Sequence, residues 1–197
     1  MTDRETLEVY ASKVDEYAAL TSSGVSKDPL LSAFISALPK GAHVLDLGCG
    51  PGHAAATMAD AGLTVTATDA VPDMIALAQR HPGVTARVAT FDDIDEVGVY
   101  DGIWANFSLL HAARADMPRH LAALHRALRA GGILHIGVKT GTGERRDPIG
   151  RLYTYYTDAE LTDLLETAGF NVNRRATGRE KGLDGVVADW IVLRAHA

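Results

Sequence analysis

The sequence predicts a doubly wound α/β domain whose mostly parallel, seven-stranded sheet ends in a C-terminal antiparallel hairpin. From Ala42 onward, short apolar runs alternate with amphipathic segments, a rhythm typical of βαβ units around a parallel sheet. Near the C-terminus, two extended runs flank a glycine-containing turn at residues 180–185, which predicts the hairpin. A glycine-rich segment at residues 48–52 follows the first apolar run and predicts a tight turn into a helix.

Two helices are expected before the sheet. Residues 3–20 form an amphipathic pattern that places Tyr10 and Tyr17 on one stripe. A loop should follow at residues 21–27. A second helix is expected at residues 29–38, because a proline at its first position suits the first turn of a helix.

In the rest of the chain, apolar runs predict strands, and helices are bounded by proline and glycine. Pro72 and Pro118 suit first helical turns, and Gly169 suits a helix C-cap. The expected strands cover residues 42–47, 64–69, 84–89, 100–106, 132–139, 171–178 and 186–194. The expected helices cover residues 53–61, 72–80, 116–129 and 158–168, with a short helical turn near residues 109–113.

Length and composition fit one globular domain. The chain has 197 residues, 47% of them hydrophobic, and no run of eighteen apolar residues that would predict a membrane span. The charged N-terminus does not resemble a signal peptide, and a single cysteine excludes an internal disulfide, so a cytoplasmic location is expected. The net charge of −6 disfavours a nucleic-acid-binding surface.

The glycine-rich turn favours a particular kind of ligand. Gly48 and Gly50 leave no Cβ between backbone and ligand, and Gly52 comes one residue early for the dinucleotide pattern G-x-G-x-x-G. Asp46 places a carboxylate beside the turn, which suits a cation better than a pyrophosphate. Asp69 closes the next apolar run about 20 residues on, where an acid can accept from ribose hydroxyls. A ribosylated cation is therefore favoured over a dinucleotide.

These residues resemble the first motif of the class I, Rossmann-like S-adenosylmethionine (SAM)-dependent methyltransferases, in particular small, bacterial-type, single-domain members. The resemblance is strongest over residues 40–140 and includes the acid at Asp69, the loop at residues 91–93 and the strand and loop at residues 100–111. It implies a methyltransferase domain over residues 1–197, with SAM as cofactor and S-adenosylhomocysteine (SAH) as product. It also implies that a helical cap, residues 1–40, folds over the cofactor.

The resemblance also implies roles for individual side chains. Asp46 would bind the α-amino group of SAM, Asp69 the ribose, and Asp92 the adenine amine, while Tyr10 or Tyr17 could reach the methionine carboxylate. The other implied cofactor contacts are Gly48, Cys49, Gly50 and Gly52 through their backbone, Ala70, Met74 and Phe91 around the adenine, and Ala105, Asn106 and Phe107 facing the sulfonium. Each has a structural alternative: a tight turn, a buried or helix-capping acid, a plain loop residue, or core packing.

Methyl transfer depends chiefly on alignment and exclusion of water, and it needs a base only when the accepting atom arrives protonated. His111, just past the expected strand at residues 100–106, is the candidate catalytic base, with packing or a simple SAM contact as the alternative. Cys49 has no basic partner at fixed spacing and is interpreted as structural rather than nucleophilic. No histidine or acid cluster has metal-ligand spacing, so no metal is expected.

The segment at residues 140–156 is long for a plain loop and is interpreted as a substrate lid. It is basic and aromatic in an otherwise acidic chain. Four cations could clamp a carboxylate or phosphate, and three tyrosines could wall a substrate pocket. The cations are Lys139, Arg145, Arg146 and Arg151, and the tyrosines are Tyr10, Tyr153 and Tyr155. A solvated loop and core packing are the respective alternatives.

The leading functional hypothesis is a SAM-dependent methyltransferase that acts on a small molecule, which could be anionic. A SAM- or SAH-binding module without catalysis is the alternative from another class. A nucleic-acid or protein methyltransferase is disfavoured by the negative net charge and because residues 104–107 lack the Asp/Asn-Pro-Pro-aromatic element of nucleic-acid amino-methylating enzymes. A dinucleotide-dependent dehydrogenase is the remaining fallback. The accepting atom, the substrate and the oligomeric state are left open.

Overall fold

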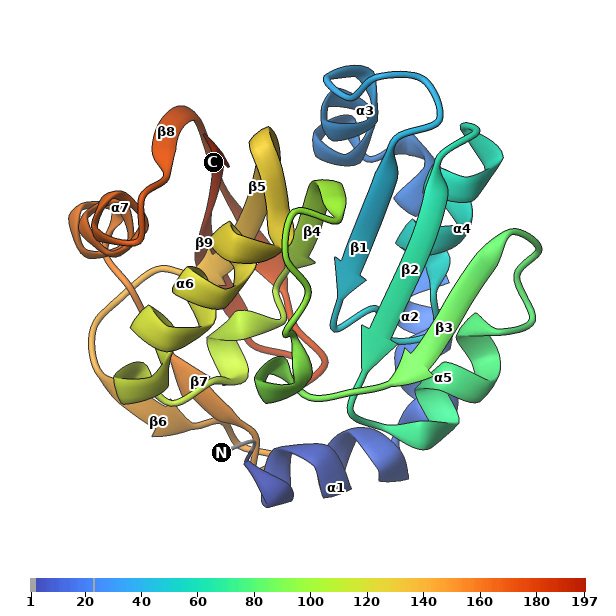
Figure 1. Ribbon diagram of the computed structural model, residues 1–197. Coiled ribbons are helices and arrows are strands. Elements are labelled where there is room, and N and C mark those ends of the chain that lie inside the picture. The colour runs from blue at the N-terminus through green and yellow to red at the C-terminus, as the bar shows by residue number, and fades with distance from the viewer. Residues whose placement is uncertain (1–2, 23) are drawn as a thin grey trace.

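A computed structural model describes residues 3–22 and 24–197 (Figure 1). Its main sheet has seven strands in the order β3-β2-β1-β4-β5-β9-β8, and all neighbouring pairs are parallel except β5–β9 and β9–β8. This arrangement confirms the predicted fold class. The strands are β1 (His43–Leu47), β2 (Thr64–Asp69), β3 (Val84–Val88), β4 (Tyr100–Asn106), β5 (Leu128–Lys139), β8 (Asn171–Lys181) and β9 (Val187–His196).

Helices cover both faces of the sheet. The α-helices are α1 (Arg4–Ser12), α2 (Val14–Ser22), α3 (Pro29–Ser36), α4 (His53–Asp60), α5 (Pro72–Ala78), α6 (Met117–Ala127) and α7 (Asp158–Thr167). Short 3-10 helices lie at η1 (Val25–Lys27), η2 (Phe91–Asp93), η3 (Leu109–His111) and η4 (Arg114–Asp116). Among the described residues, no helix is long and apolar enough to cross a membrane.

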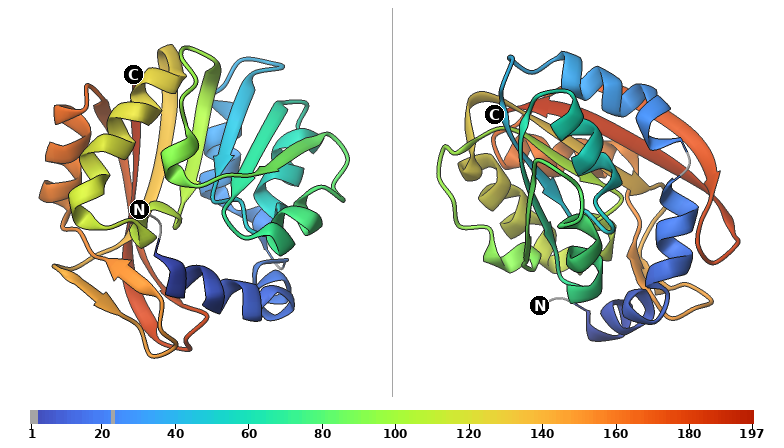
Figure 2. Two further views of the ribbon diagram at one scale, coloured as in Figure 1. Left: turned by 60° about the horizontal axis from the view of Figure 1, so that its bottom comes forward. Right: turned by 90° about the vertical axis from the view of Figure 1, so that its right-hand side faces the viewer.

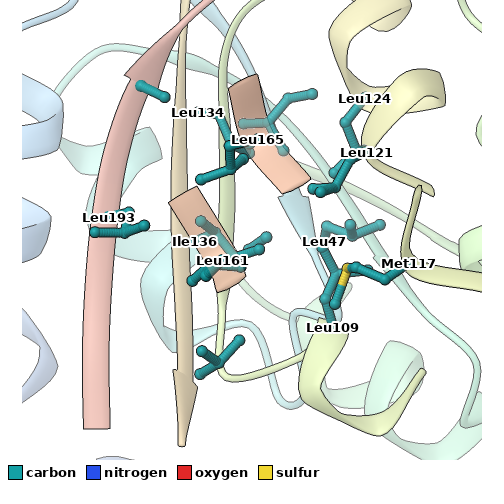
Figure 3. Close-up of a cluster of buried hydrophobic side chains, with 14 of the residues drawn as sticks. Leu47, Leu109, Met117, Leu121, Leu124, Leu134, Ile136, Leu161, Leu165 and Leu193 are labelled. Carbon is teal, nitrogen blue, oxygen red and sulfur yellow. The ribbon is translucent and has the colours of Figure 1, made fainter. Parts of the chain in front are cut away.

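The two cores follow from the alternation of side chains along β1. Leu45 and Leu47 join a cluster under α6 and α7, whereas Val44 joins a second cluster under α3, α4 and α5. Successive strand residues point to opposite faces, so a strand buried on both faces must be apolar throughout. Figure 3 shows the first cluster, in which Leu121 of α6 and Leu161 of α7 meet leucines of the sheet. The apolar strand that ends in Asp46 and Leu47 is therefore fixed from both sides.

The N-terminal segment is two helices rather than the single helix expected at residues 3–20. The break falls at Lys13, whose backbone angles are not helical and whose N–H caps Tyr10 O. In a continuous helix, residues seven apart would be separated by about 10 Å along the axis. The break instead brings the rings of Tyr10 and Tyr17 to a centroid distance of 5.2 Å. The helix α2 also extends to Ser22, two residues into the expected loop, and residue 23 lies outside the described residues.

The boundary between α6 and β5 also differs from the expectation. The strand begins at Leu128, not at residue 132, because Leu128 pairs with Tyr100 across an irregularity in the ladder between Tyr100 and Gly102. The helix α6 accordingly ends at Ala127. The C-terminal hairpin is confirmed, and both of its strands are longer than expected.

The segment interpreted as a lid has structure of its own. Residues 144–146 (β6, Glu144–Arg146) pair with β7 (Leu152–Thr154) as a small antiparallel hairpin. This β6–β7 hairpin lies beside α1 at the carboxyl edge of the sheet (Figure 2). Two contacts join them: Arg146 pairs with Asp3 at 2.8 Å, and Leu152 N donates to Thr6 Oγ1 at 2.8 Å.

Candidate active site

A cavity of about 690 Å³ opens at the carboxyl ends of β1, β2 and β4, beneath α1. In open α/β sheets this edge is where ligands bind. We call it the first cavity, and it is lined by Asp3, Thr6, Leu7, Tyr10, Tyr17, Leu47, Gly48, Gly50, Asp69, Ala70, Val71, Met74, Ala89, Thr90, Phe91, Phe107, Ser108 and His111.

The glycine turn shapes the floor of the first cavity. Gly48 has φ +71°, and a Cβ at this position would overlap Ser108 Cβ, so only glycine fits. At Gly50, a Cβ would lie 3.1 Å from the Tyr17 ring. The turn is tied to the second strand because Gly48 N and Cys49 N both donate to Thr68 O, at 2.8 and 2.9 Å. Backbone, rather than side chains, therefore faces the ligand at this point.

Two carboxylates give this end of the molecule its charge. Asp69 accepts from Gly50 N and from Val71 N, each at 2.9 Å, and still lines the cavity. Because a carboxylate has about four acceptor positions, it keeps capacity for ligand hydroxyls. Asp46 is buried beneath the turn. Burial, and secondarily the charge of Asp69, raises the pKa of Asp46 to about 7.

Two polar atoms beside the glycine turn have no hydrogen-bond partner in the described part of the chain. They are Asp46 Oδ2 and Ser108 Oγ, both buried. An unpartnered buried acceptor is costly unless a ligand or water satisfies it. An ammonium group of a ligand, reached directly or through water, would satisfy the Asp46 carboxylate and lower its pKa. These acceptor groups therefore fit a cationic ligand that also carries hydroxyl groups.

A second cavity, of about 520 Å³, adjoins the first and shares Tyr10, Tyr17 and Phe107 with it. Phe107 is the described non-glycine residue with positive φ, 57°, and this strained conformation sets its ring at the junction of the cavities. The lining of the second cavity is completed by Leu110, Lys139, Arg151, Tyr153, Glu180, Lys181, Gly182, Leu183, Ala188 and Trp190.

A buried polar chain crosses the junction. Arg151, 2% exposed, donates from Nε and Nη2 to Asp147 Oδ2 and from Nη1 to Tyr10 Oη at 2.8 Å. Tyr10 Oη lies 2.9 Å from His111 Nε2, and His111 Nδ1 lies 2.7 Å from Leu152 O. A carbonyl only accepts, so Nδ1 carries the proton and Nε2 accepts from the Tyr10 hydroxyl. Burial lowers the pKa of His111 to about 4 and keeps the ring neutral.

Most of the predicted residues converge on these two cavities. The first cavity brings together Tyr17, Gly48, Gly50, Asp69, Ala70, Met74, Phe91 and His111, and the second holds Lys139, Arg151 and Tyr153, with Tyr10 in both. Asp46 lies directly under the first. The binding roles of these residues remain predictions.

Other predicted residues lie outside both linings. Cys49 is buried, and burial raises the pKa of its thiol. Gly52 packs on Ala78 of α5, and Ala105 lies in the core. Asp92 pairs with Arg119 at 2.6 Å. The remaining four predicted residues also have protein partners. Asn106 Oδ1 lies 3.0 Å from His135 Nε2, and Arg146 pairs with Asp3. The other two, Arg145 and Tyr155, stack on each other.

Several lining residues were not singled out by the sequence interpretation. Ser108 follows β4 in the same run as His111 and could have been included for that reason. Trp190 gave no local signal, because it reaches the site only through the pairing of β9 with β5. Asp3 caps the N-terminus of α1 and Thr6 lies on that helix, whose position over the sheet no local pattern specifies.

The sheet order, the glycine turn and the acids beside it define a Rossmann-like domain for a nucleoside ligand. A family model described as "Methyltransferase domain" matches residues 44–132. The chain is 31% identical over 184 residues to an uncharacterized methyltransferase of Synechocystis sp., covering 85% of this chain and 84% of that one. The chain therefore belongs to the class I SAM-dependent methyltransferases.

Two further comparisons agree with this assignment. The "Ubiquinone biosynthesis O-methyltransferase" of Xanthomonas axonopodis pv. citri is 29% identical over 152 residues, which cover 68% of this chain and 63% of that protein's length. A crystal structure of the 1,6-didemethyltoxoflavin-N1-methyltransferase of Burkholderia thailandensis, with bound SAH, superposes with a TM-score of 0.78. It is 26% identical and covers 98% of this chain and 87% of that one.

The residues present fit SAM. Gly48 and Gly50 line the cavity with backbone, Asp69 can accept from ribose hydroxyls, and the unpartnered oxygen of Asp46 suits an ammonium group. Phe91 and Met74 provide apolar walls on the side toward β3 where a base would lie.

Proposed function

We propose that this protein transfers the methyl group of SAM to a small molecule held in the second cavity. The observation that carries the proposal is the junction of the two cavities. Tyr10, Tyr17 and Phe107 belong to both linings, so a ligand in each would meet at these three rings. The net positive charge of the residues lining the second cavity favours an anionic acceptor.

Bound SAM would supply a methyl group on a positively charged sulfur. The chain's own contribution is alignment and exclusion of water, since α1 covers the first cavity and the β6–β7 hairpin adjoins it. For an acceptor whose accepting atom carries a proton, Tyr10 Oη takes that proton while giving its own to His111 Nε2. Arg151 stabilises negative charge on the tyrosine oxygen during this exchange, and the proton ends on the imidazole.

The experiment has two stages. Calorimetric titration with SAM and SAH tests the first cavity, and we expect binding of both that Asp69→Ala weakens by about tenfold or more, because buried hydrogen bonds to the ligand are lost. Incubation with SAM and a library of phenols, carboxylic acids and amines, read by mass spectrometry, then tests methyl transfer. A folded protein that binds neither SAM nor SAH at millimolar concentration would refute the proposal.

The second candidate is a SAM- or SAH-binding module without catalysis. The observation that favours it is that both ring nitrogens of His111 already have protein partners. It predicts binding without SAH release over the whole library. Its distinguishing measurement is SAH release by the natural protein. If SAH is released, His111→Ala should reduce that turnover and leave SAM affinity nearly unchanged.

A further inference from the structure

The side chains around the second cavity indicate the charge of the acceptor as well as its size. The lining includes Lys139, Arg151 and Lys181, against a single acid, Glu180. Arg151 forms its buried pair with Asp147, and Lys181 is an exposed residue of β8. Lys139 is therefore the half-buried cation of this lining that has no paired carboxylate among the described residues.

Lys139 has an unusual environment for a lysine. Its ammonium lies over the ring of Tyr153, 3.9 Å from the centroid, and within the described residues it has no hydrogen bond and no carboxylate within 4 Å. Burial lowers its pKa, against a smaller opposing effect of Asp184 and Asp147. A half-buried ammonium without a counter-ion gains most from an anionic partner, because the interaction is screened less than at the surface.

The walls of the same cavity are aromatic. The whole chain has 4 Phe, 2 Trp and 6 Tyr, and five of these line the second cavity. They come from four separate parts of the chain: α1 and α2, the turn after β4, the β6–β7 hairpin, and β9. The β6–β7 hairpin and the β8–β9 turn project beyond the same edge of the sheet (Figure 2). Rings on several sides favour a flat, aromatic guest that can stack or pack edge to face.

We propose that the second cavity binds a planar aromatic oxyanion, with its ring between the tyrosine, phenylalanine and tryptophan walls and its charged oxygen on Lys139 Nζ. This inference rests on the proposed function, in which the second cavity is the acceptor site. It adds the chemical class of the acceptor and the residue that selects it. The acid-lined first cavity would repel the same anion, so the acceptor and SAM are directed to different cavities by charge.

Binding to the SAH-loaded protein tests the proposal without any turnover. The probes are benzoate, 2-naphthoate and phenyl phosphate as aromatic oxyanions, benzamide and 2-naphthamide as neutral counterparts, and cyclohexanecarboxylate as the non-aromatic acid. At least one aromatic oxyanion should bind about tenfold or more tightly than the amides, since a charge-assisted hydrogen bond is lost in the amide. Cyclohexanecarboxylate should bind roughly two- to tenfold more weakly than benzoate.

Variants assign the effect to one side chain. Lys139→Gln should abolish the preference for the oxyanion, and Lys139→Arg should retain part of it, while both keep the SAH affinity of the natural protein. Lys40→Gln makes the same charge change at an exposed position in the turn before β1 and should leave the preference intact.

Three results would overturn the inference: no aromatic oxyanion binds, the amides bind equally well, or Lys139→Gln retains the preference. SAH binding in the same titrations separates this failure from failure of the proposed function. If SAH binds but the oxyanions do not, the class of acceptor is wrong and the methyltransferase assignment stands.

Discussion

The two cavities share three aromatic side chains and differ in almost everything else. The first is bounded by backbone at Gly48 and Gly50 and by the carboxylate of Asp69, and within the described chain no lysine or arginine lines it. The second is bounded by aromatic rings and cations. One cavity is thus built for a positively charged ligand with hydroxyl groups, and the other for a ligand with negative charge and a flat apolar body.

The contrast extends to how each cavity is made. Apart from the residues of α1 and α2 that cover it, the first is formed by strand ends and the turns that follow them, so most of its residues lie close to local sequence signals. The second is assembled from α1, the β6–β7 hairpin and the β8–β9 turn, which are far apart in the chain. This arrangement suits an enzyme with a fixed cofactor and a variable acceptor, because the loops that hold the acceptor can change without disturbing the strand ends that hold the cofactor.

The largest expected effect breaks the first cavity alone. Gly48→Ala should destabilise the protein by about 2–4 kcal/mol and reduce SAH affinity strongly, because the new methyl group overlaps Ser108 Cβ in addition to the strain at φ +71°. Chemical denaturation and calorimetric titration measure the two effects.

Gly62→Ala is the matched control for this change. Gly62 has φ +85° but nothing within 4 Å of an added Cβ, so the substitution introduces backbone strain without overlap. It should cost about 1 kcal/mol of stability and leave SAH affinity unchanged. Equal losses of affinity in the two variants would show that the close approach to Ser108 has no role in binding.

The different construction of the two cavities explains which features could be predicted from the sequence. Apolar runs identified the central strands, because a strand buried on both faces must be apolar along its length. The largely exposed β8 was identified instead from the extended runs on either side of a glycine-containing turn. The glycine turn located the first cavity for a similar reason, since its chemistry depends on neighbours in the chain. The break at Lys13 and the early start of β5 at Leu128 were missed, because tertiary contacts decide both.

The second cavity shows the limit of such prediction. Lys139, Arg151 and Tyr153 were predicted from the basic, aromatic character of their segment, but so were Arg145, Arg146 and Tyr155, which face elsewhere. Composition alone does not say which cation is paired. Arg146 meets Asp3 more than a hundred residues away, and that pairing appears only when α1 is placed beside the β6–β7 hairpin.

The next prediction addresses the wall between the cavities. Tyr10→Phe removes the hydroxyl that links Arg151 to His111 but keeps the ring. With an acceptor whose accepting atom carries a proton, kcat should fall by about 100-fold, because a general acid–base step is lost, whereas KM and SAH affinity change little.

Tyr100→Phe is the matched control, since it removes a hydroxyl that donates to Glu96 at the opposite end of β4. Its kcat should equal that of the natural protein. If Tyr10→Phe also keeps full kcat, the polar chain holds α1 against the hairpin but moves no proton, and His111 has a packing role.

The smallest expected effect is a dependence of SAH affinity on pH, which follows from the charge of Asp46 beneath the first cavity. The pKa of Asp46 is raised to about 7, so the free protein holds this carboxyl partly protonated at neutral pH. An ammonium group binds the ionised form and lowers that pKa. SAH affinity should therefore be constant above the pKa of the free protein and decrease as pH falls below it, by at most about tenfold per pH unit.

Calorimetric titration of SAH between pH 5.5 and 7.5 measures this dependence, within a range where an α-amino group stays largely protonated. Asp46→Asn should bind more weakly at pH 7.5 and lose the pH dependence, because an amide neither titrates nor carries charge. If the variant keeps the slope of the natural protein, Asp69 or another group titrates instead. The contrast in charge between the two cavities would then rest on Asp69 rather than on the buried acid beneath the turn.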